Sequence, residues 1–430
     1  MSAGICIMNK NAIVLAADSA VTIGNHVAIH NSANKLFSLS YNAPIGVIIY
    51  ANSTLMSMPV EIIVKEYKKQ LGNKDFPHLK DYVDDFIKYV ESKSKYFRFD
   101  INEKDYILQV FISLIEGLNF DYNKFLNEEK QKGITLNDSV IKSIAETAVK
   151  MTIQFVNQMP IRPEYNFKSY IKTNYIGLFK DFIKKRGLSW LTDEQINEVC
   201  EKSCSLYDTD FERSGYVGVA IGGYGKDEIY PHLTHIHISG FIDGKLKWKI
   251  INELDISENN GAMIVPLAQV DVMQTFLFGI NDEFIKDLAG EIPKRIDECI
   301  NSIDMDCLAL DKKSIVQGKM KSVTKLITDH MADTANKKYM IPILQSVASL
   351  PIEELALLAE SMINITSLKR KVVNDKNIGT VGGPVDVSVI SKGDGFIWLK
   401  RKHYFDEKYN PQYFYTHFNK YDIGDSNEDD

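Results

Sequence analysis

The chain starts with short apolar runs separated by polar turns, a pattern that predicts β-hairpins. The first pair of runs, Ala3–Ile7 and Ala12–Ala17, flanks a turn at residues 9–11. The second pair is Asn34–Leu39 and Ile45–Ala51. Because these runs are almost continuously apolar, we expect strands that are buried on both faces.

The hydrophobic period changes after Pro59, where apolar residues recur at the spacing of one helical stripe. Residues 72–212 keep helical spacing and are rich in Lys, Asp, Asn, Tyr and Phe, so we expect an all-helical insertion there. Strand patterns then return, and helical spacing reappears at residues 267–370. The strands predicted after the insertion are Gly215–Tyr224, Thr234–Phe241, Leu246–Leu254, Pro384–Ile390 and Gly395–Lys400.

This order of elements predicts the α+β fold class, with helices packed on two sheets rather than alternating with single strands. We expect residues 1–71 and 213–405 to form one sandwich, with the helical insertion at 72–212 between them. Residues 406–430 are predicted to form a C-terminal extension. Its last residues are acidic and carry no apolar side chains, so we expect that tail to fray.

Composition and charge limit the classes of function. The 430 residues are 45% hydrophobic and 25% charged, which is typical of a soluble globular protein. Lys and Arg number 50 against 57 Asp and Glu, and the formal charge of −7 disfavours binding to nucleic acid. An apolar run of about 18 residues and a signal-peptide pattern are both absent, so we expect no membrane contact. The five cysteines are sparse and odd in number, which favours a reducing cytoplasm.

The second residue is a candidate nucleophile. Met1 is followed by Ser2, whose small side chain favours removal of the initiator methionine. A chain that begins at Ser2 carries a hydroxyl and an α-amine in one residue, and the ordinary pKa of that amine is about 7.7 to 8.0. The amine can therefore act as the base that a serine hydroxyl needs before it attacks an amide.

Several segments resemble the β-type subunits of the proteasome, which are N-terminal-nucleophile (Ntn) hydrolases. They include residues 2–7, residues 14–25 around Asp18, and residues 34–36. In that family an N-terminal threonine is the nucleophile, an aspartate ends the second strand and a lysine follows. Counting back from Asp18 by the family interval reaches Ser2, and a one-residue insertion brings the lysine to Lys35.

Residues 217–224 with the strand after them, and residues 382–387, extend this likeness. The resemblance implies a four-layer αββα Ntn-hydrolase sandwich that cleaves peptide bonds. It also implies a homo-oligomer, peptide or protein substrates, and an unfoldase as a further protein partner. The site residues that it implies are Ser2, Asp18 and Lys35 for catalysis, the backbone amide of Asn52 for the oxyanion, and Val21 and Thr22 for substrate binding.

Elementary electrostatics gives these residues a mechanism. A Lys35 ammonium near the Ser2 amine would favour the neutral amine, and Asp18 would keep that lysine charged and oriented. Asn52 lies in the turn that leaves an apolar strand, where its amide could receive the oxyanion. Taken singly, Asp18 is an ordinary strand-end residue and Lys35 a solvated charge, so the hypothesis depends on their spacing from Ser2.

The sequence also departs from the family pattern. Serine replaces threonine and lacks the methyl group that fixes the hydroxyl rotamer. The family's supporting aspartate and serine fall near Ile378 and Val381, which are apolar, although Asp375 is close by. A catalytically inactive assembly subunit with the same fold is therefore the alternative hypothesis.

Neither a metal nor a cofactor is predicted. His235 and His237 alternate along a predicted strand and share a face, but a third ligand could only be guessed at His232, so a polar strand face is favoured. Cys200 and Cys204 lack a second cysteine pair, which favours buried thiols. The basic stretch at residues 400–403 is interpreted as a solvated surface.

Overall fold

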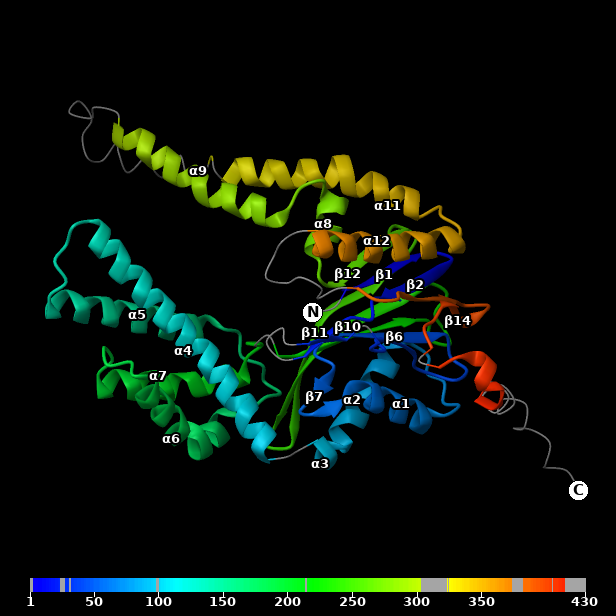
Figure 1. The fold of residues 1–430 in the computed structure, drawn as a ribbon, viewed down its shortest axis with the longest axis horizontal. Coiled ribbons are helices and arrows are strands. Elements are labelled where there is room, and N and C mark those ends of the chain that lie inside the picture. The colour runs from blue at the N-terminus through cyan, green and yellow to red at the C-terminus, as the bar shows by residue number, and fades with distance from the viewer. Residues whose placement is uncertain are drawn as a thin grey trace, which may run out of the picture.

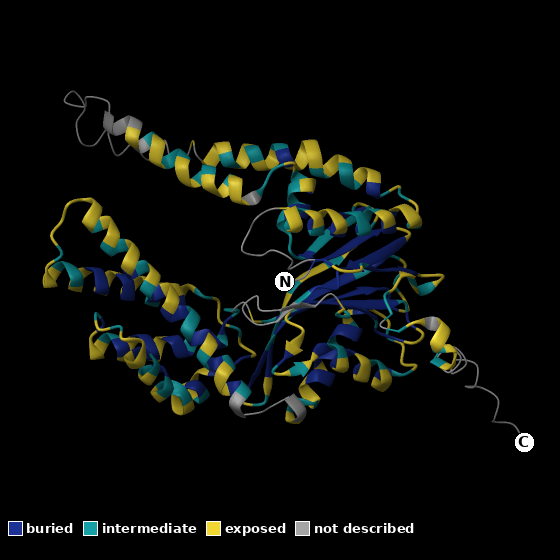
Figure 2. Ribbon diagram, viewed as in Figure 1, coloured by how far each residue is buried: buried dark blue, intermediate teal, exposed yellow. Residues whose placement is uncertain are grey.

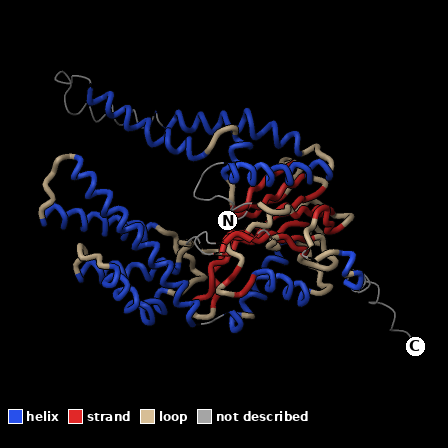
Figure 3. The backbone as a smooth tube through the Cα atoms, in the orientation of Figure 1, coloured by secondary structure: helices blue, strands red, loops and turns tan. Residues whose placement is uncertain are grey.

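The computed structural model describes residues 3–23, 28–30, 32–97, 100–212, 215–302, 323, 325–372, 382–403 and 405–413. It is 53% helical and 22% strand, which confirms the predicted mixed α+β chain. Strands gather in one part of the molecule, and helices lie on either side of them (Figures 1 and 3). No helix within these ranges has both the length and the apolar content needed to cross a membrane.

One five-stranded sheet has the order β12-β1-β2-β13-β14, and all its neighbouring strands are antiparallel. Gly4 and Asp386 both lie opposite Ala17, so the start of β1, the end of β2 and the start of β13 meet at one end of the sheet. The strands are β1 Ala3–Asn9, β2 Ala12–Ala17, β12 Ala262–Ala268, β13 Asp386–Ser391 and β14 Gly395–Lys400.

The edge strand β12 is one that the sequence pattern did not predict. It pairs with β1 along its whole length, from Ala268 opposite Ala3 to Ala262 opposite Asn9. Pro266 lies inside this strand and has no N–H to donate to a ladder, so it weakens the strand pattern in the sequence. An edge strand tolerates proline because one of its sides has no ladder to complete.

The second five-stranded sheet has the order β11-β10-β9-β6-β5. Apolar side chains of both sheets form a shared core. A Cβ atom on Gly46 would lie 2.8 Å from side-chain carbons of Leu15 and Ile390, so the close approach of the sheets requires glycine there. The remaining strands are β3 Val21–Ile23, β4 Ala28–His30, β5 Leu36–Ser38, β6 Ile45–Ala51, β7 Thr54–Leu55, β8 Met58–Pro59, β9 Val217–Gly223, β10 His232–Ile242 and β11 Lys245–Asp255.

Helices cover the outer face of each sheet (Figure 1). Helices α1 and α2 share an apolar cluster with β6, β9 and β10, whereas α8, α11 and α12 share another with β1, β2 and β13. Helix α9 extends away from the sheets. The bounds are α1 Val60–Leu71, α2 Leu79–Ser92, α8 Asp271–Phe278, α9 Asp282–Ser302, the π-helix Asn336–Met340, α11 Ile341–Val347 and α12 Ile352–Val372.

The helices between residues 100 and 208 pack around a core of their own. Phe111 and Phe179 stack with ring centroids 4.1 Å apart, and Tyr122 and Trp190 stack at 3.9 Å. Figure 2 shows buried faces of these helices inside the group and exposed faces outside it. The bounds are α3 Ser94–Phe97, α4 Asp100–Gln131, α5 Asp138–Gln158, α6 Lys168–Arg186, α7 Asp193–Ser203 and the 3-10 helix Cys204–Asp208.

The range expected to form a separate insertion, residues 72–212, contains helices of two kinds. Helix α2 packs with α1 on the second sheet, whereas the separate core is built from α4 onward. The sequence pattern could not distinguish them, because both have the same helical period. Cys200 and Cys204 are buried in the separate core. The C-terminal extension is described as far as residue 413, so the predicted acidic tail lies outside the described residues.

Candidate active site

A buried carboxylate joins three segments at the Ala3 end of the first sheet. Asp18 follows β2 and is 1% exposed. Its Oδ1 accepts hydrogen bonds from the Ala3 amide at 2.8 Å and from Lys35 Nζ at 2.5 Å. Its Oδ2 accepts from the amides of Ala20 at 3.2 Å and Gly382 at 3.1 Å. These donors compensate a charge that is costly to bury alone.

Lys35 precedes β5 and is 4% exposed. Its ammonium group donates to Asp18 and, at 2.6 Å, to the carbonyl oxygen of Ala20. Burial lowers the pKa of Lys35, and the attraction of Asp18 offsets part of that effect. The structure thus brings Asp18 and Lys35 into direct contact, as a buried ion pair.

Ser2 itself lies outside the described residues, and Ala3 is the described residue next to it. The Ala3 amide donates to the Asp18 side chain, and the Ala3 carbonyl accepts a hydrogen bond from the Asp18 amide at 3.0 Å. Asp18 therefore holds the residue after the candidate nucleophile through both of its backbone polar groups.

Asn52, the expected oxyanion donor, follows the last residue of β6. Its backbone amide donates to the Tyr216 carbonyl at 3.2 Å, and its side-chain amide donates to the Gly215 carbonyl at 2.8 Å. The backbone N–H of Asn52 is therefore already bonded to the residue directly before β9. The sequence hypothesis assumed that this N–H is free to donate to the oxyanion, whereas in the structure it points to Tyr216.

The neighbouring amide of Ala51 has a different direction. The Ile49 amide donates to the Lys35 carbonyl at 2.8 Å, across the β5 side of β6, whereas the Asn52 amide is directed to the β9 side. Because successive amides of a strand alternate in direction, the Ala51 N–H is directed to the side of Lys35. Ala51 then adopts a φ of 63°, which turns the chain away at this point.

The expected substrate-binding residues lie in the hairpin that follows Asp18. Val21 begins β3, directly after Ala20, whose carbonyl binds Lys35. Thr22 lies opposite Ile29 in the pairing of β3 with β4. The hairpin therefore begins directly after the Ala20 carbonyl that binds Lys35. The Thr22 side chain lies outside the described part of the structure.

A second buried ion pair lies beside the first, and the sequence analysis did not predict it. Asp386 in β13 accepts hydrogen bonds from both the backbone amide and the ammonium group of Lys402. Both side chains are largely buried. The interpretation of residues 400–403 as solvated surface is therefore wrong for Lys402. Lys402 is buried because it contacts Asp386 in β13, which is separated from it in sequence by the β13–β14 hairpin. The local pattern of charges does not reveal such a contact.

His235 and His237 share a face of β10, as predicted, and they converge on the hydroxyl of Tyr50. The Tyr50 Oη lies 2.8 Å from His237 Nε2 and also contacts His235 Nε2. His237 Nδ1 lies 2.9 Å from Glu212, which is also paired with Lys249. Among the described residues, no group of three or more His, Cys, Asp or Glu side chains is arranged to hold a metal ion.

Hydrogen-bond logic assigns the protons in this network. A Glu212 carboxylate only accepts, so His237 Nδ1 carries a proton, and its Nε2 accepts from the Tyr50 hydroxyl. Tyr50 then accepts from His235 Nε2, which leaves His235 Nδ1 as a bare acceptor. That atom is buried and has no hydrogen-bond partner among the described residues. Burial, and then the nearby His237, lower the pKa of His235 to about 4.

The direction of the strands places this network at the same end of the sandwich as Asp18. A Cβ on Gly4 would contact Ile48, and a Cβ on Gly46 would contact Leu15, which pairs with Cys6. Residue 46 of β6 therefore lies near the level of Cys6, and residue 48 lies near Gly4. The chain of β6 thus runs toward the start of β1. Tyr50, two residues further, lies toward the Ala3 end.

No family model and no curated protein matches the chain. Solved structures to which it is similar include three of Anbu, each at 10% sequence identity. They are the Gly-1 mutant of Anbu from Hyphomicrobium sp. strain MC1 (TM-score 0.28, covering 100% of both chains), Anbu (ancestral beta-subunit) from Yersinia bercovieri (0.27, 99% of both) and the helical assembly of the Anbu complex from Pseudomonas aeruginosa (0.30, 99% of this chain and 98% of that one). The chemistry of the site follows from the contacts described above.

Those contacts define what the site can do chemically. Two lysines, Lys35 and Lys402, are held by buried carboxylates at one end of the first sheet. The positive charge of Lys402 further lowers the pKa of Lys35. An amine placed beside these ammonium groups would bind a proton less readily, and so would be a better base near neutral pH.

Proposed function

We propose that the chain is an Ntn hydrolase that cleaves peptide amide bonds through Ser2, after removal of Met1. One observation carries the proposal. A single oxygen of the buried Asp18 carboxylate binds both Lys35 Nζ and the amide of Ala3, the residue after Ser2. This contact supports a site in which a lysine and an N-terminal serine are positioned by the same group.

In this mechanism the Ser2 α-amine accepts the hydroxyl proton while Oγ attacks the carbonyl carbon of the substrate amide. Lys35, charged and held by Asp18, keeps that amine neutral by like-charge repulsion. The same proton then passes to the leaving amine, and water hydrolyses the acyl intermediate. We assign the oxyanion to the N–H of Ala51 in place of that of Asn52, because the Asn52 amide is bonded to Tyr216.

The proposal extends to the fold and the substrate path. The helix, sheet, sheet, helix packing supports a four-layer αββα sandwich of the Ntn-hydrolase type, formed mainly by residues 1–71 and 213–405. We propose that the inserted helical unit starts at α4, because α2 packs on the sheet. Val21 and Thr22 are proposed to bind the backbone of the substrate. We propose that the protein acts in the cytoplasm, where an unfoldase would supply protein substrates.

Ser2→Ala is expected to reduce hydrolysis of a chromogenic peptide amide to the uncatalysed rate. Because a terminal hydroxyl makes little packing contact, the free energy of unfolding should change by less than about 0.5 kcal/mol. The exposed Ser143 on α5 gives the matched control, since Ser143→Ala removes the same hydroxyl far from the site. A covalent Ntn inactivator should label Ser2 in the unmodified protein, as read by peptide mapping. Full activity in Ser2→Ala would remove Ser2 from the mechanism.

The second candidate function is a catalytically inactive assembly subunit. The engagement of the Asn52 amide by Tyr216 is the observation that favours it, because it occupies the donor that the resemblance implies. Intact mass separates the two candidates. A retained Met1 leaves no free Ser2 amine and excludes the proposed hydrolase, whereas loss of Met1 together with inactivator labelling at Ser2 excludes the inactive subunit.

Both candidates predict a homo-oligomer. Helix α12 exposes several large apolar side chains, among them Leu368 at 62% and Val372 at 74% exposure. Apolar side chains exposed to this extent along one helix favour contact between copies. Light scattering at micromolar concentration is expected to give a mass of at least two chains, and Leu368→Glu should shift it toward one. A wild-type protein that stays monomeric contradicts the assembly prediction.

A further inference from the structure

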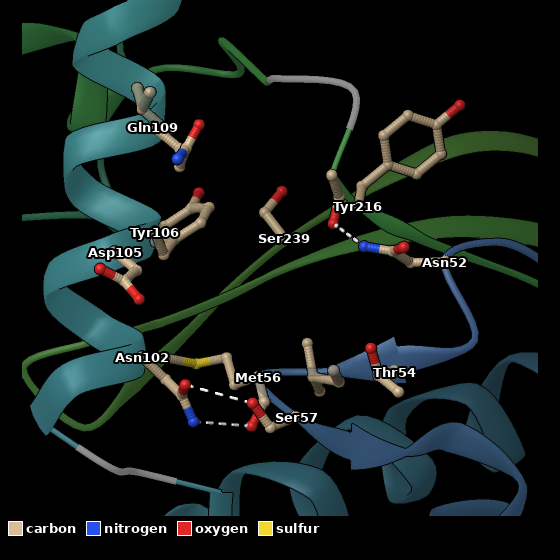
Figure 4. A pocket seen from close by; sticks show the side chains of 13 residues that line it. Asn52, Thr54, Met56, Ser57, Asn102, Asp105, Tyr106, Gln109, Tyr216 and Ser239 are labelled. Carbon is tan, nitrogen blue, oxygen red and sulfur yellow. Dashed lines mark hydrogen bonds between the residues drawn. The ribbon is translucent and has the colours of Figure 1, made fainter. Parts of the chain in front are cut away.

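A pocket of about 260 Å³ lies between the sandwich and the helical unit. Its walls come from the hairpin after β6, from the segment before β9, from β10 and from α4 (Figure 4). Pockets at the boundary between two packed units are common binding sites, and this volume suits one side chain better than a whole drug-sized molecule. The lining residues are Asn52, Thr54, Leu55, Met56, Ser57, Asn102, Asp105, Tyr106, Gln109, Val110, Gly215, Tyr216 and Ser239.

The charge of this pocket is negative. Among the described residues that line it, Asp105 is the only one with a charged side chain. The Asp105 side chain is exposed on α4. Figure 4 shows Asn102, Tyr106 and Gln109 of α4 on the side that faces Ser239, with the Asp105 carboxylate in front of the helix. The walls therefore combine one exposed carboxylate with polar groups and the ring of Tyr106.

The neutral lining groups offer acceptors to a ligand. The Asn52 side-chain NH₂ donates to Gly215, which leaves its carbonyl oxygen as the group available to a ligand. The Asn102 NH₂ donates to the Met56 carbonyl, and its Oδ1 accepts from the Ser57 hydroxyl at 3.2 Å, so Asn102 is engaged within the wall of the pocket. The Tyr106 ring adds a face over which a cation is attracted, whereas the Tyr216 ring stacks on His237 with centroids 3.8 Å apart. A cationic group with several N–H donors matches this set, whereas a carboxylate would face Asp105.

We propose that this pocket binds the cationic side chain, guanidinium or ammonium, of a peptide substrate. The inference rests on the proposed function and names its substrate class. Asn52 lines the pocket and directly follows Ala51, whose amide is assigned to the oxyanion. A side chain of a peptide held at Ala51 would enter the pocket across the end of β6, on its β9 side. Through α4, the helical unit supplies substrate selection.

The expected size of the preference follows from the exposure of Asp105. An ion pair with a solvated carboxylate is a weak interaction, and the face of the Tyr106 ring adds to it. We therefore expect about a fivefold to tenfold preference for a basic side chain over a neutral one of similar length. The preference should shrink as salt is added, because exposed charges are screened.

Binding is tested on the full chain carrying Ser2→Ala, so that no turnover is needed. The probes are arginine amide and norleucine amide, which share the α-amine and carboxamide and differ in side-chain charge. Arginine amide is expected to bind about fivefold more tightly, as measured by calorimetry. Adding Asp105→Asn should remove that difference. Adding Glu116→Gln, which deletes an exposed charge from the same helix outside the pocket, should leave it intact.

The outcomes separate this pocket from the proposed reaction. Equal binding of the two amides, or an unchanged preference in Asp105→Asn, overturns the pocket assignment whatever the activity shows. Hydrolysis by the Ser2 protein of Arg, norleucine and Glu peptide amides at equal rates also overturns it, while leaving the hydrolase proposal standing. A charge-dependent preference that Asp105→Asn abolishes, in a protein that hydrolyses none of these amides, keeps the pocket and rejects the reaction.

Discussion

Replacing Lys35 by methionine is expected to lower the free energy of unfolding by about 3 to 5 kcal/mol, because the substitution leaves the Asp18 charge buried without its partner. Asp18 and Lys35 are 1% and 4% exposed, so water cannot easily replace the lost contact. Asp18 would keep its backbone donors, which limits the loss to this range. Urea unfolding at pH 7.5 measures the change.

Lys65 provides the matched control for burial. Its ammonium group lies 2.6 Å from Glu61, nearly the separation of 2.5 Å between Lys35 and Asp18, but the Lys65 side chain is 59% exposed. Lys65→Met is therefore expected to cost no more than about 0.5 kcal/mol. The double variant Asp18→Asn with Lys35→Met should recover part of the loss, since it removes the orphaned charge. Equal losses for Lys35→Met and Lys65→Met would contradict the buried pair.

Much of the fold could be predicted because local pattern and tertiary role agree in these segments. The run Ile45–Ala51 and the strand Gly395–Lys400 have the bounds that their apolar spacing indicates. Prediction failed where the two disagree. Pro266 weakens a strand pattern that an edge position tolerates, and α2 has the same helical period as α4 although it packs on a different core.

The site shows the same division. Asp18 and Lys35 could be linked through the spacing of the family that the segment resembles, with a one-residue insertion before Lys35. The pair of Asp386 and Lys402 could not, because charge alone does not distinguish a buried lysine from a solvated one. The alternation of His235 and His237 predicted a shared face, but Tyr50 and Glu212 come from distant segments. Tyr50 meets the two histidines only because the sheet has the order β10-β9-β6. The order of strands in a sheet cannot be inferred from the local sequence pattern.

Acidification from pH 6.5 to pH 5 is expected to destabilise the protein through His235. In the unfolded chain a histidine takes up its proton near pH 6.5, whereas folded His235, with its pKa lowered to about 4, stays neutral until far lower pH. The unfolded state therefore binds more protons in this window, so stability falls as the pH falls. The unfolded histidine is only half protonated at pH 6.5, so the full slope of 1.36 kcal/mol per pH unit is reached only at lower pH, and the loss is about 1.5 kcal/mol by pH 5. The pKa of Glu212 lies below its ordinary 4.5, because hydrogen bonds from His237 and Lys249 outweigh the effect of burial. Glu212 therefore contributes to the loss of stability only at lower pH.

The bare Nδ1 of His235 explains why the folded state resists this proton. A proton added there would be buried with no acceptor among the described residues, beside the ring of His237. His235→Gln removes the titration and should flatten the stability profile between pH 6.5 and pH 5 in urea unfolding. His232→Gln, on the same strand but more exposed, should keep the wild-type slope. If His235→Gln loses as much stability as the wild type across this window, the acid sensitivity belongs to other groups, and His235 is not held neutral by the fold.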